Sequence, residues 1–308
     1  MIKKIAVITP VSHLVGIKEL LDTKGEIFYL EDNPIKSKVR VLLETKDIDT
    51  IVCNPNQQSF KIDKQLLNNT KVKIINSCST GLNHIDLEYC KSQNIEIQCH
   101  KNDYELINQL PSTSELAFGL MVSLLRNIPK CNNHVKNYGW DYTRFMGRQV
   151  KDLTIGIIGY GRLGKMMKKY CDAFDAKTYV YDPYVDIKQT SLKEIFKKCD
   201  VVSLHVHVTN ETKYMISEEL LGLSKKGLYI INTSRGEIVK EEDVVKALNN
   251  GKLIGYGTDV IENEFDNIKD SPIIKAMNKG KNVIVTPHIG GMTTEGQTKA
   301  YKWSIDKL

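Results

Sequence analysis

The feature that most constrains this chain is a glycine-rich turn in the middle of its sequence. The apolar run Thr154–Ile158 ends in a Gly-x-Gly-x-x-Gly pattern formed by Gly159, Gly161 and Gly164. Residues 165–174 then have the pattern of a helix, and residues 178–181 are β-branched and aromatic, as is typical of a strand. A strand, a glycine turn, a helix and a second strand in this order indicate a βαβ unit that binds a dinucleotide.

Each glycine of the turn has its own mechanical reason. Gly159 lets the chain turn sharply off the strand, Gly161 lets the backbone approach a pyrophosphate, and Gly164 lets the helix pack closely on the strand. The helix N-terminus then offers unpaired N–H groups to the phosphates. Asp182 ends the second strand, where a carboxylate accepts hydrogen bonds from ribose hydroxyls and repels a 2′-phosphate. The motif therefore predicts NAD as the cofactor, against the alternative of a purely structural glycine turn.

The composition is that of an ordinary globular protein. The 308 residues are 41% hydrophobic and 26% charged, and scattered lysines give the net charge of +6. No basic stripe with interleaved aromatic residues is present, so nucleic acid is not an expected partner. No apolar stretch is long enough to span a membrane, and the opening run stops at Thr9-Pro10, too early for a signal peptide. The seven cysteines lack Cys-x-x-Cys spacing, which favours reduced thiols in a cytoplasmic protein.

Strand and helix patterns alternate along the chain and predict an α/β protein with two doubly wound parallel sheets. Strands are predicted at residues 5–8, 26–29, 50–52, 72–75, 95–98, 154–158, 178–181, 201–204, 228–232, 253–258 and 282–285. Helices are predicted at residues 15–21, 34–45, 63–67, 86–92, 111–128, 165–174, 217–222, 241–249, 272–277 and 294–308. The first βα turn lacks the glycine pattern. We therefore predict a Rossmann NAD-binding domain, residues 102–288, inserted into a flavodoxin-like substrate domain made of residues 1–101 and 289–308.

The longest of these helices, residues 111–128, is apolar almost all the way round, so both of its faces should be covered. Pro129 is expected to end it. The aromatic segment Tyr138-Gly139-Trp140-Asp141 that follows has two interpretations. It packs on a second subunit as an arm, or it forms a lid on its own helix.

Three polar residues follow three consecutive predicted strands of the second domain. Arg235 follows the strand 228–232, Glu264 the strand 253–258, and His288 the strand 282–285. In an open parallel sheet, ligands bind beyond the carboxyl ends of the strands. These side chains are therefore expected to converge on one site.

The chemistry of hydride transfer matches this set. An arginine fork grips a carboxylate with two hydrogen bonds and polarises the adjacent carbonyl. A histidine delivers a proton to the oxygen while hydride reaches the carbon, and a neighbouring glutamate fixes the histidine tautomer and favours its protonated form. Taken singly, each residue has a plainer interpretation: Arg235 as a surface charge, His288 as a loop histidine, Glu264 as a solvated carboxylate.

Together the motifs resemble those of the D-isomer-specific 2-hydroxyacid dehydrogenases, an NAD-dependent family. The matching motifs are Thr80-Gly81-Leu82-Asn83-His84-Ile85-Asp86, the helix that starts at Ser112, the glycine pattern with Asp182, Asn232-Thr233-Ser234-Arg235-Gly236, Asp259-Val260 with Glu264, and Pro287-His288-Ile289-Gly290-Gly291. The resemblance implies that Arg235 binds the substrate carboxylate, that His288 is the acid/base, and that Glu264 pairs with His288.

The resemblance also implies the remaining contacts. Backbone N–H groups around Thr80-Gly81-Leu82, with Ser79 beside them, cradle the substrate carboxylate, and Asp259 lies near the nicotinamide carboxamide. A homodimer forms through the cofactor domain, using the long helix and the arm. The residues expected at the cofactor are Gly159, Gly161, Arg162, Leu163, Gly164, Asp182, His205, Thr212, Thr233, Ser234, Asp259 and Gly291.

Three positions depart from the family pattern. His207 stands where a proline is usual, Ser79 replaces a glycine, and Phe265 follows Glu264 where a proline is frequent. The pair His205-x-His207 could mimic two metal ligands on one strand face, but no third ligand is evident nearby, so no metal is predicted and a cofactor-side or structural role is favoured.

Two polar loops bear on the substrate. Residues 54–59 and 77–83 carry no Arg or Lys, whereas a phosphorylated substrate needs cations. The sequence therefore favours a small unphosphorylated 2-oxoacid or 2-hydroxyacid such as hydroxypyruvate. Formate dehydrogenase, a relative, is disfavoured because it pairs its histidine with glutamine.

Two rival functions stay open. A non-catalytic NAD(H)-sensing regulator, as in the family's transcriptional corepressors, can retain the same three polar residues. It predicts NADH binding without turnover. An amino-acid dehydrogenase predicts ammonia-dependent turnover and a catalytic lysine, and the sequence marks none.

Overall fold

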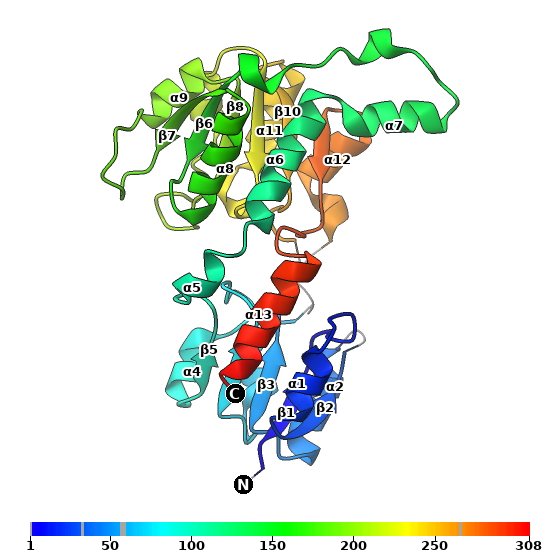
Figure 1. The fold of residues 1–308 in the computed structure, drawn as a ribbon, viewed down its shortest axis with the longest axis vertical. Helices are drawn as coiled ribbons and strands as arrows, with labels where there is room; N and C mark the ends of the chain where they lie inside the picture. Colours follow the sequence, from blue (N-terminus) through cyan, green and yellow to red (C-terminus); the bar gives the residue numbers. More distant parts are fainter. Residues whose placement is uncertain (1, 32–33, 56–59, 265–266) are drawn as a thin grey trace. The chain divides into compact units, whose positions relative to one another are not determined.

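The computed structural model describes residues 2–31, 34–55, 60–264 and 267–308. The chain divides into two compact units (Figure 1), the first made of residues 1–110 and 291–308 and the second of residues 111–290. The sequence had placed these boundaries after residues 101 and 288. The observed division follows a short helix, α5 (Tyr104–Ile107), which the sequence analysis had not predicted.

The first unit is a five-stranded parallel sheet with helices on both faces. Its strands are β1 (Lys4–Val7), β2 (Glu26–Tyr29), β3 (Thr50–Cys53), β4 (Ile74–Ser77) and β5 (Glu96–Gln98), and its helices are α1 (Ile17–Asp22), α2 (Lys36–Thr45), α3 (Lys64–Leu67), α4 (Leu87–Ser92), α5 and α13 (Thr294–Asp306). The strand order is β2-β1-β3-β4-β5, so the order reverses between β1 and β3. This is the flavodoxin-like order that the sequence predicted.

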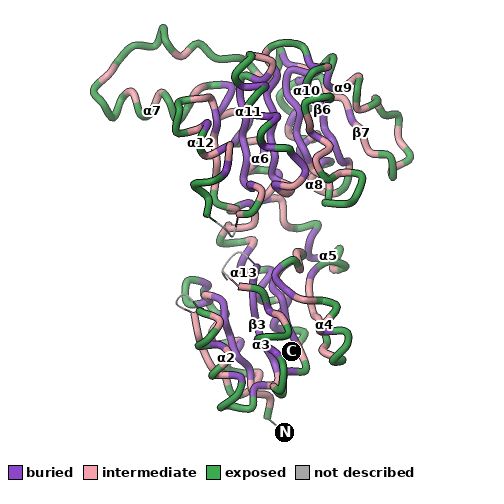
Figure 2. Tube along the Cα trace, turned by 180° about the vertical axis from the view of Figure 1, so that it is seen from behind, coloured by how far each residue is buried: buried purple, intermediate pink, exposed green. Residues whose placement is uncertain are grey.

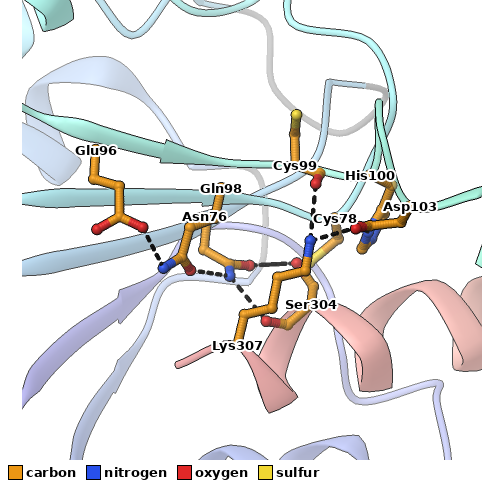
Figure 3. Close-up of polar contacts among 9 residues, drawn as sticks. All are labelled: Asn76, Cys78, Glu96, Gln98, Cys99, His100, Asp103, Ser304 and Lys307. Atoms are coloured by element: carbon orange, nitrogen blue, oxygen red, sulfur yellow. Dashed lines mark hydrogen bonds and ion pairs between the residues drawn. The ribbon is translucent and has the colours of Figure 1, made fainter.

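The last helix, α13, returns to this sheet and completes its core. Tyr301 and Ile305 are fully buried against Ile5 and Val7. The Asn76 side chain on β4 makes two hydrogen bonds with Ser304. Its amide nitrogen donates to the Ser304 carbonyl at 2.9 Å, and its oxygen accepts from the Ser304 hydroxyl at 2.5 Å. One turn on, Lys307 bonds the Cys99 carbonyl and the Asp103 carboxylate (Figure 3). These contacts hold the end of the chain in the first unit.

The second unit is a six-stranded parallel sheet. Its strands are β6 (Thr154–Ile158), β7 (Lys177–Tyr181), β8 (Val201–Leu204), β9 (Leu228–Asn232), β10 (Leu253–Thr258) and β11 (Val283–Val285), and its helices are α6 (Ser112–Leu125), α7 (Ile128–Lys136), α8 (Arg162–Ala173), α9 (Leu192–Lys198), α10 (Glu218–Gly222), α11 (Glu241–Asn249) and α12 (Pro272–Asn278). The strand order is β11-β10-β9-β8-β6-β7, with the reversal between β6 and β8.

Both faces of the second sheet are covered, as the unbroken apolar strands require. Ile155 and Ile157 point to the face covered by α6 and α8, and Ile158 lies in the core on the other face with Phe196 of α9. The buried residues follow the strands of both sheets (Figure 2). This packing fixes the strand ends, where the candidate site residues follow.

The structure corrects the prediction around Pro129. Pro129 does not end the long helix. Asn127 ends it by adopting a left-handed conformation with φ +54°, and Pro129 lies in the first turn of a separate helix, α7. Proline is well suited to a first helical turn because no N–H is needed there. Helix α9 was also missing from the prediction. Among the described residues, no helix combines the length and the apolar character needed to cross a bilayer.

Candidate active site

The three glycines of the turn differ in what surrounds them. Gly159 has φ +89°, and a Cβ there would lie 2.6 Å from the His205 carbonyl oxygen. A Cβ on Gly164 would lie 2.0 Å from the Gly159 carbonyl oxygen, so α8 packs directly on the turn. Apart from its chain neighbours, a Cβ on Gly161 would meet no atom of the described residues within 4 Å. Packing within the chain therefore explains two of the glycines, and the space beside the third fits a bound pyrophosphate.

Asp182 lies against this turn. One carboxylate oxygen accepts from the Tyr160 N–H at 2.7 Å, and the other accepts from the Tyr184 N–H at 3.0 Å. The carboxylate is half-buried and still has acceptor capacity. It is therefore placed at the end of β7 where the ribose of NAD is expected.

Two buried polar atoms beyond the strand ends lack partners among the described residues: the Thr233 hydroxyl and Nδ1 of His205. An unsatisfied buried polar atom costs about 1–3 kcal/mol, and a bound ligand can supply the missing hydrogen bond. The other ring nitrogen of His205 lies 2.9 Å from the Ser203 hydroxyl, and burial lowers the pKa of His205 to about 4. His205 is therefore a neutral ring at the edge of the predicted cofactor site.

The remaining predicted cofactor residues are spread over several elements. Arg162 begins α8, and burial lowers the pKa of its guanidinium. The Leu163 carbonyl accepts from the Ser114 hydroxyl of α6, and the Ser234 hydroxyl donates to the Leu204 carbonyl. Thr212 lies on an exposed loop and donates to the His207 carbonyl. Gly291 belongs to the first unit, where its carbonyl accepts from Gln297. Within the described ranges, no three His, Cys, Asp or Glu side chains gather as metal ligands.

The three predicted catalytic residues follow adjacent strands of one sheet. Asn232 at the end of β9 pairs with Thr258 at the end of β10, and Thr258 pairs with Val285 at the end of β11. Arg235, Glu264 and His288 each come within a few residues of these positions. All three therefore lie at the carboxyl edge of the sheet.

Glu264 and His288 form a direct pair. Nδ1 of His288 lies 2.8 and 2.9 Å from the two carboxylate oxygens of Glu264. Both side chains are mostly shielded from solvent, with exposures of 26% and 18%. His288 has φ +54°, a conformation that is uncommon for residues other than glycine, and its N–H donates to the Asp259 carbonyl at 2.9 Å. The pairing fixes the orientation of the imidazole ring through Nδ1. Phe265, the next residue after Glu264, lies outside the described residues.

Asp259 holds the histidine loop. The residue is only 2% exposed. Its carboxylate accepts hydrogen bonds from the Thr286 hydroxyl at 2.5 Å, the Ile289 N–H at 2.8 Å and the Gly290 N–H at 2.7 Å. Burial raises the pKa of Asp259, although these hydrogen bonds oppose the shift. The carboxylate therefore organises the residues on both sides of His288. Sequence analysis had not identified Thr286, although a hydroxyl residue directly after a strand end is a usable signal.

Arg235 remains available for an anion. Among the described residues its guanidinium makes one hydrogen bond, from Nη1 to the neighbouring Ser234 carbonyl at 2.7 Å, while the Asn232 side chain holds the Arg235 carbonyl at 3.0 Å. Anchoring of the backbone with a largely uncommitted fork suits a carboxylate-binding role.

The loop expected to cradle the same carboxylate lies in the first unit, after β4. The Ser79 hydroxyl accepts from the Gly81 N–H at 3.1 Å, and the Ser79 carbonyl accepts from His100. The Leu82 carbonyl accepts from Ile85. Ser79 thus takes one of the N–H groups of the loop for itself, and the N–H groups of Thr80 and Leu82 have no acceptor among the described residues.

Both domains of the chain match a known protein family. Residues 118–290 match the NAD-binding domain of the D-isomer specific 2-hydroxyacid dehydrogenases, and residues 5–102 match the catalytic domain of the same family. The chain belongs to this family. The two matched domains correspond to the two sheets, so the second unit is the NAD-binding domain of a D-2-hydroxyacid dehydrogenase fold.

Relatives in the D-2-hydroxyacid dehydrogenase family carry several activities. Hydroxypyruvate reductase of Thermotoga maritima is 28% identical over 94% of this chain and 92% of that protein. Glyoxylate reductase of Thermococcus litoralis is 32% identical over 92% of this chain and 86% of that protein. D-3-phosphoglycerate dehydrogenase of Methanocaldococcus jannaschii is 32% identical over 96% of this chain, but the match covers only 55% of that enzyme. The chain spans about half the length of the phosphoglycerate dehydrogenases that it matches.

Solved structures agree on the fold. The D-lactate dehydrogenase of Aquifex aeolicus, in complex with NAD and lactic acid, superposes with a TM-score of 0.77 at 28% identity, covering 99% of this chain and 94% of that one. The apo D-lactate dehydrogenase of Escherichia coli gives a TM-score of 0.82 at 22% identity, covering 98% and 95%, and shows the fold alone.

Proposed function

We propose that this protein interconverts a small, unphosphorylated 2-oxoacid and the corresponding D-2-hydroxyacid, using NAD(H). The observation that carries the proposal is the Glu264–His288 pair at the same sheet edge as the uncommitted guanidinium of Arg235. This combination provides a proton donor and a carboxylate anchor in one domain. The family match supports the NAD-dependent class.

The roles follow from the chemistry of each group. Bound NADH supplies the hydride that reaches the substrate carbon, or NAD accepts it in the reverse direction. Arg235 holds the substrate carboxylate through its guanidinium fork and polarises the neighbouring carbonyl. His288 donates a proton from Nε2 to the carbonyl oxygen during reduction and accepts it during oxidation. Glu264 keeps the ring oriented and stabilises the protonated imidazole.

The substrate class rests on charge. The loop 77–83 has no cationic side chain, and neither has the loop 54–59, of which residues 56–59 lie outside the described residues. A phosphoryl group binds best to Arg and Lys. Hydroxypyruvate and glyoxylate, the substrates in the names of two relatives, fit such a site.

We also propose a cytoplasmic homodimer. Helix α7 has no buried residue, and the arm and the residues after it expose Tyr138, Trp140, Tyr142 and Met146, each at least 89% accessible. Such a cluster of exposed aromatic side chains is typical of an interface, and a second copy of this chain is the proposed partner. The cysteines of the described residues are all free thiols, in keeping with a reducing compartment.

The test follows NADH absorbance over a panel of 2-oxoacids that includes hydroxypyruvate and phosphohydroxypyruvate. We expect turnover of the unphosphorylated acids. His288→Ala should remove turnover and spare NADH binding, and Arg235→Ala should mainly weaken substrate binding. A strong preference for the phosphorylated acid would refute the substrate class, and NADH binding without any turnover would favour the regulator instead.

A further inference from the structure

The loops that carry Arg235 and Glu264 touch each other through their backbones. A Cβ on Gly236, the residue after Arg235, would lie 2.1 Å from the Ile261 carbonyl carbon and 2.3 Å from the Glu262 nitrogen. Only glycine permits this approach. The segment 261–262 therefore lies directly on the arginine loop, two residues before Glu264.

A buried carboxylate holds the same segment from another side. Glu241 begins α11 and is 4% exposed. One of its oxygens accepts from the Glu262 N–H at 2.9 Å, and the other accepts from the Ser271 hydroxyl at 2.7 Å. The Ser271 hydroxyl in turn accepts from the N–H groups of Ile273 and Ile274 and caps α12. Glu241 thus ties the Glu264 loop to two helix N-termini.

A second tie acts on the Glu262 side chain. The Tyr214 hydroxyl donates to the Glu262 carboxylate, and the Tyr214 N–H donates to the Glu237 carbonyl at 2.8 Å. Between Glu262 and Glu264, Asn263 lies in a turn with φ +56°, and the next residue, Glu264, pairs with His288. Among the described residues, no hydrogen bond joins Glu241 or Tyr214 to Arg235 or Glu264, so each acts on them through the chain around Glu262.

We propose that Glu241 is a positioning residue for the active site: its buried carboxylate fixes the segment 261–264 against Gly236, so that Glu264 reaches His288 at a set distance from Arg235. An ordinary glutamate at the start of a helix would be solvated and would only stabilise the helix through its dipole. A buried carboxylate shared between a loop N–H and a capping serine does more, because losing it leaves the Glu262 N–H without its acceptor. This inference rests on the proposed function of the Glu264–His288 pair.

The test compares two buried carboxylates of the same helix. Glu241→Ala removes both hydrogen bonds, and Glu241→Gln keeps an acceptor for the Glu262 N–H but loses the acceptor for the Ser271 hydroxyl. Asp243→Ala is the matched control, since Asp243 is 3% exposed and accepts from the Glu218 N–H at 2.9 Å, away from the three candidate residues. For each variant, urea unfolding, kcat and KM for hydroxypyruvate, NADH affinity and the nitrogen-15 NMR signal of the His288 ring are measured, with His288→Gln used to assign that signal.

We expect Glu241→Ala to lower kcat by about 10- to 100-fold, the effect of misplacing a catalytic group by about 1 Å, with NADH affinity unchanged and the Nδ1 signal of His288 shifted. Glu241→Gln should restore most of kcat, and Asp243→Ala should lose stability without either change. If Glu241→Ala moves neither kcat nor the ring signal beyond what Asp243→Ala does, the inference is wrong. If the wild-type protein turns over no 2-oxoacid, the proposed function fails, and the ring signal alone then decides whether Glu241 positions the pair.

Discussion

A pair of glycine substitutions separates a ligand-binding role from a packing role within one turn. In Gly161→Ala the new methyl group meets no described residue beyond its chain neighbours within 4 Å, and φ is −70°, which alanine adopts without strain. The free energy of unfolding should therefore stay within about 1 kcal/mol of wild type. In Gly164→Ala the methyl group lies 2.0 Å from the Gly159 carbonyl oxygen, and such overpacking costs about 1–3 kcal/mol or more.

The two variants should rank in the opposite order for NADH affinity, with the larger loss in Gly161→Ala. If the pyrophosphate binds beside Gly161 as proposed, the methyl group of Gly161→Ala meets it, and overpacking of about 1–3 kcal/mol at that contact corresponds to a roughly 5- to 150-fold weaker affinity. Urea unfolding gives the stability of both variants, and quenching of intrinsic fluorescence by NADH gives the affinity. If Gly161→Ala binds NADH as tightly as wild type, the cofactor does not lie against this turn.

Three further predictions concern stability and assembly. Asn76→Ala should lower the free energy of unfolding by about 3 kcal/mol in urea titrations, because it leaves the buried hydroxyl and carbonyl of Ser304 without their partner; a loss below about 1 kcal/mol would show that water replaces the amide. Burial lowers the pKa of His84 from 6.5 to about 4, so the unfolded chain binds a proton that the folded state excludes. This contribution to stability is complete above pH 6.5 and is lost as the pH falls toward 4. The loss between pH 7 and pH 5 is about 2 kcal/mol. His84→Gln should flatten that part of the pH dependence of the unfolding free energy, and an unchanged slope would exclude His84 as its source. Trp140→Ser should convert the proposed dimer into monomers in light scattering, and a variant that stays dimeric would place the interface elsewhere.

Much of the architecture could be predicted because the signals were local. The apolar run before Gly159 and the spacing of the glycines define a strand, a turn and a helix whatever the rest of the chain does. The polar residues that follow β9, β10 and β11 were predictable for the same reason, since parallel strands bring their carboxyl ends to one edge. The family resemblance and both sheet topologies are confirmed.

Other features depended on contacts that a linear pattern does not contain. Pro129 was expected to stop a helix, but a left-handed Asn127 stops it first and leaves the proline free to start the next. In the sequence, Glu241 does not differ from any charged residue at a helix N-terminus, and only the fold shows that it is buried. Likewise, no sequence signal shows that the Asp259 carboxylate is occupied by the loop of His288.

The most direct test of the account is a double-mutant cycle on the catalytic pair. The kcat for hydroxypyruvate reduction is measured for wild type, Glu264→Gln, His288→Gln and the double variant, with NADH affinity measured alongside. If the two side chains act as one unit, the double variant should be no slower than His288→Gln alone, and all four proteins should bind NADH equally. Effects that simply multiply, or substantial turnover by His288→Gln, would contradict the assignment of the pair as the proton donor.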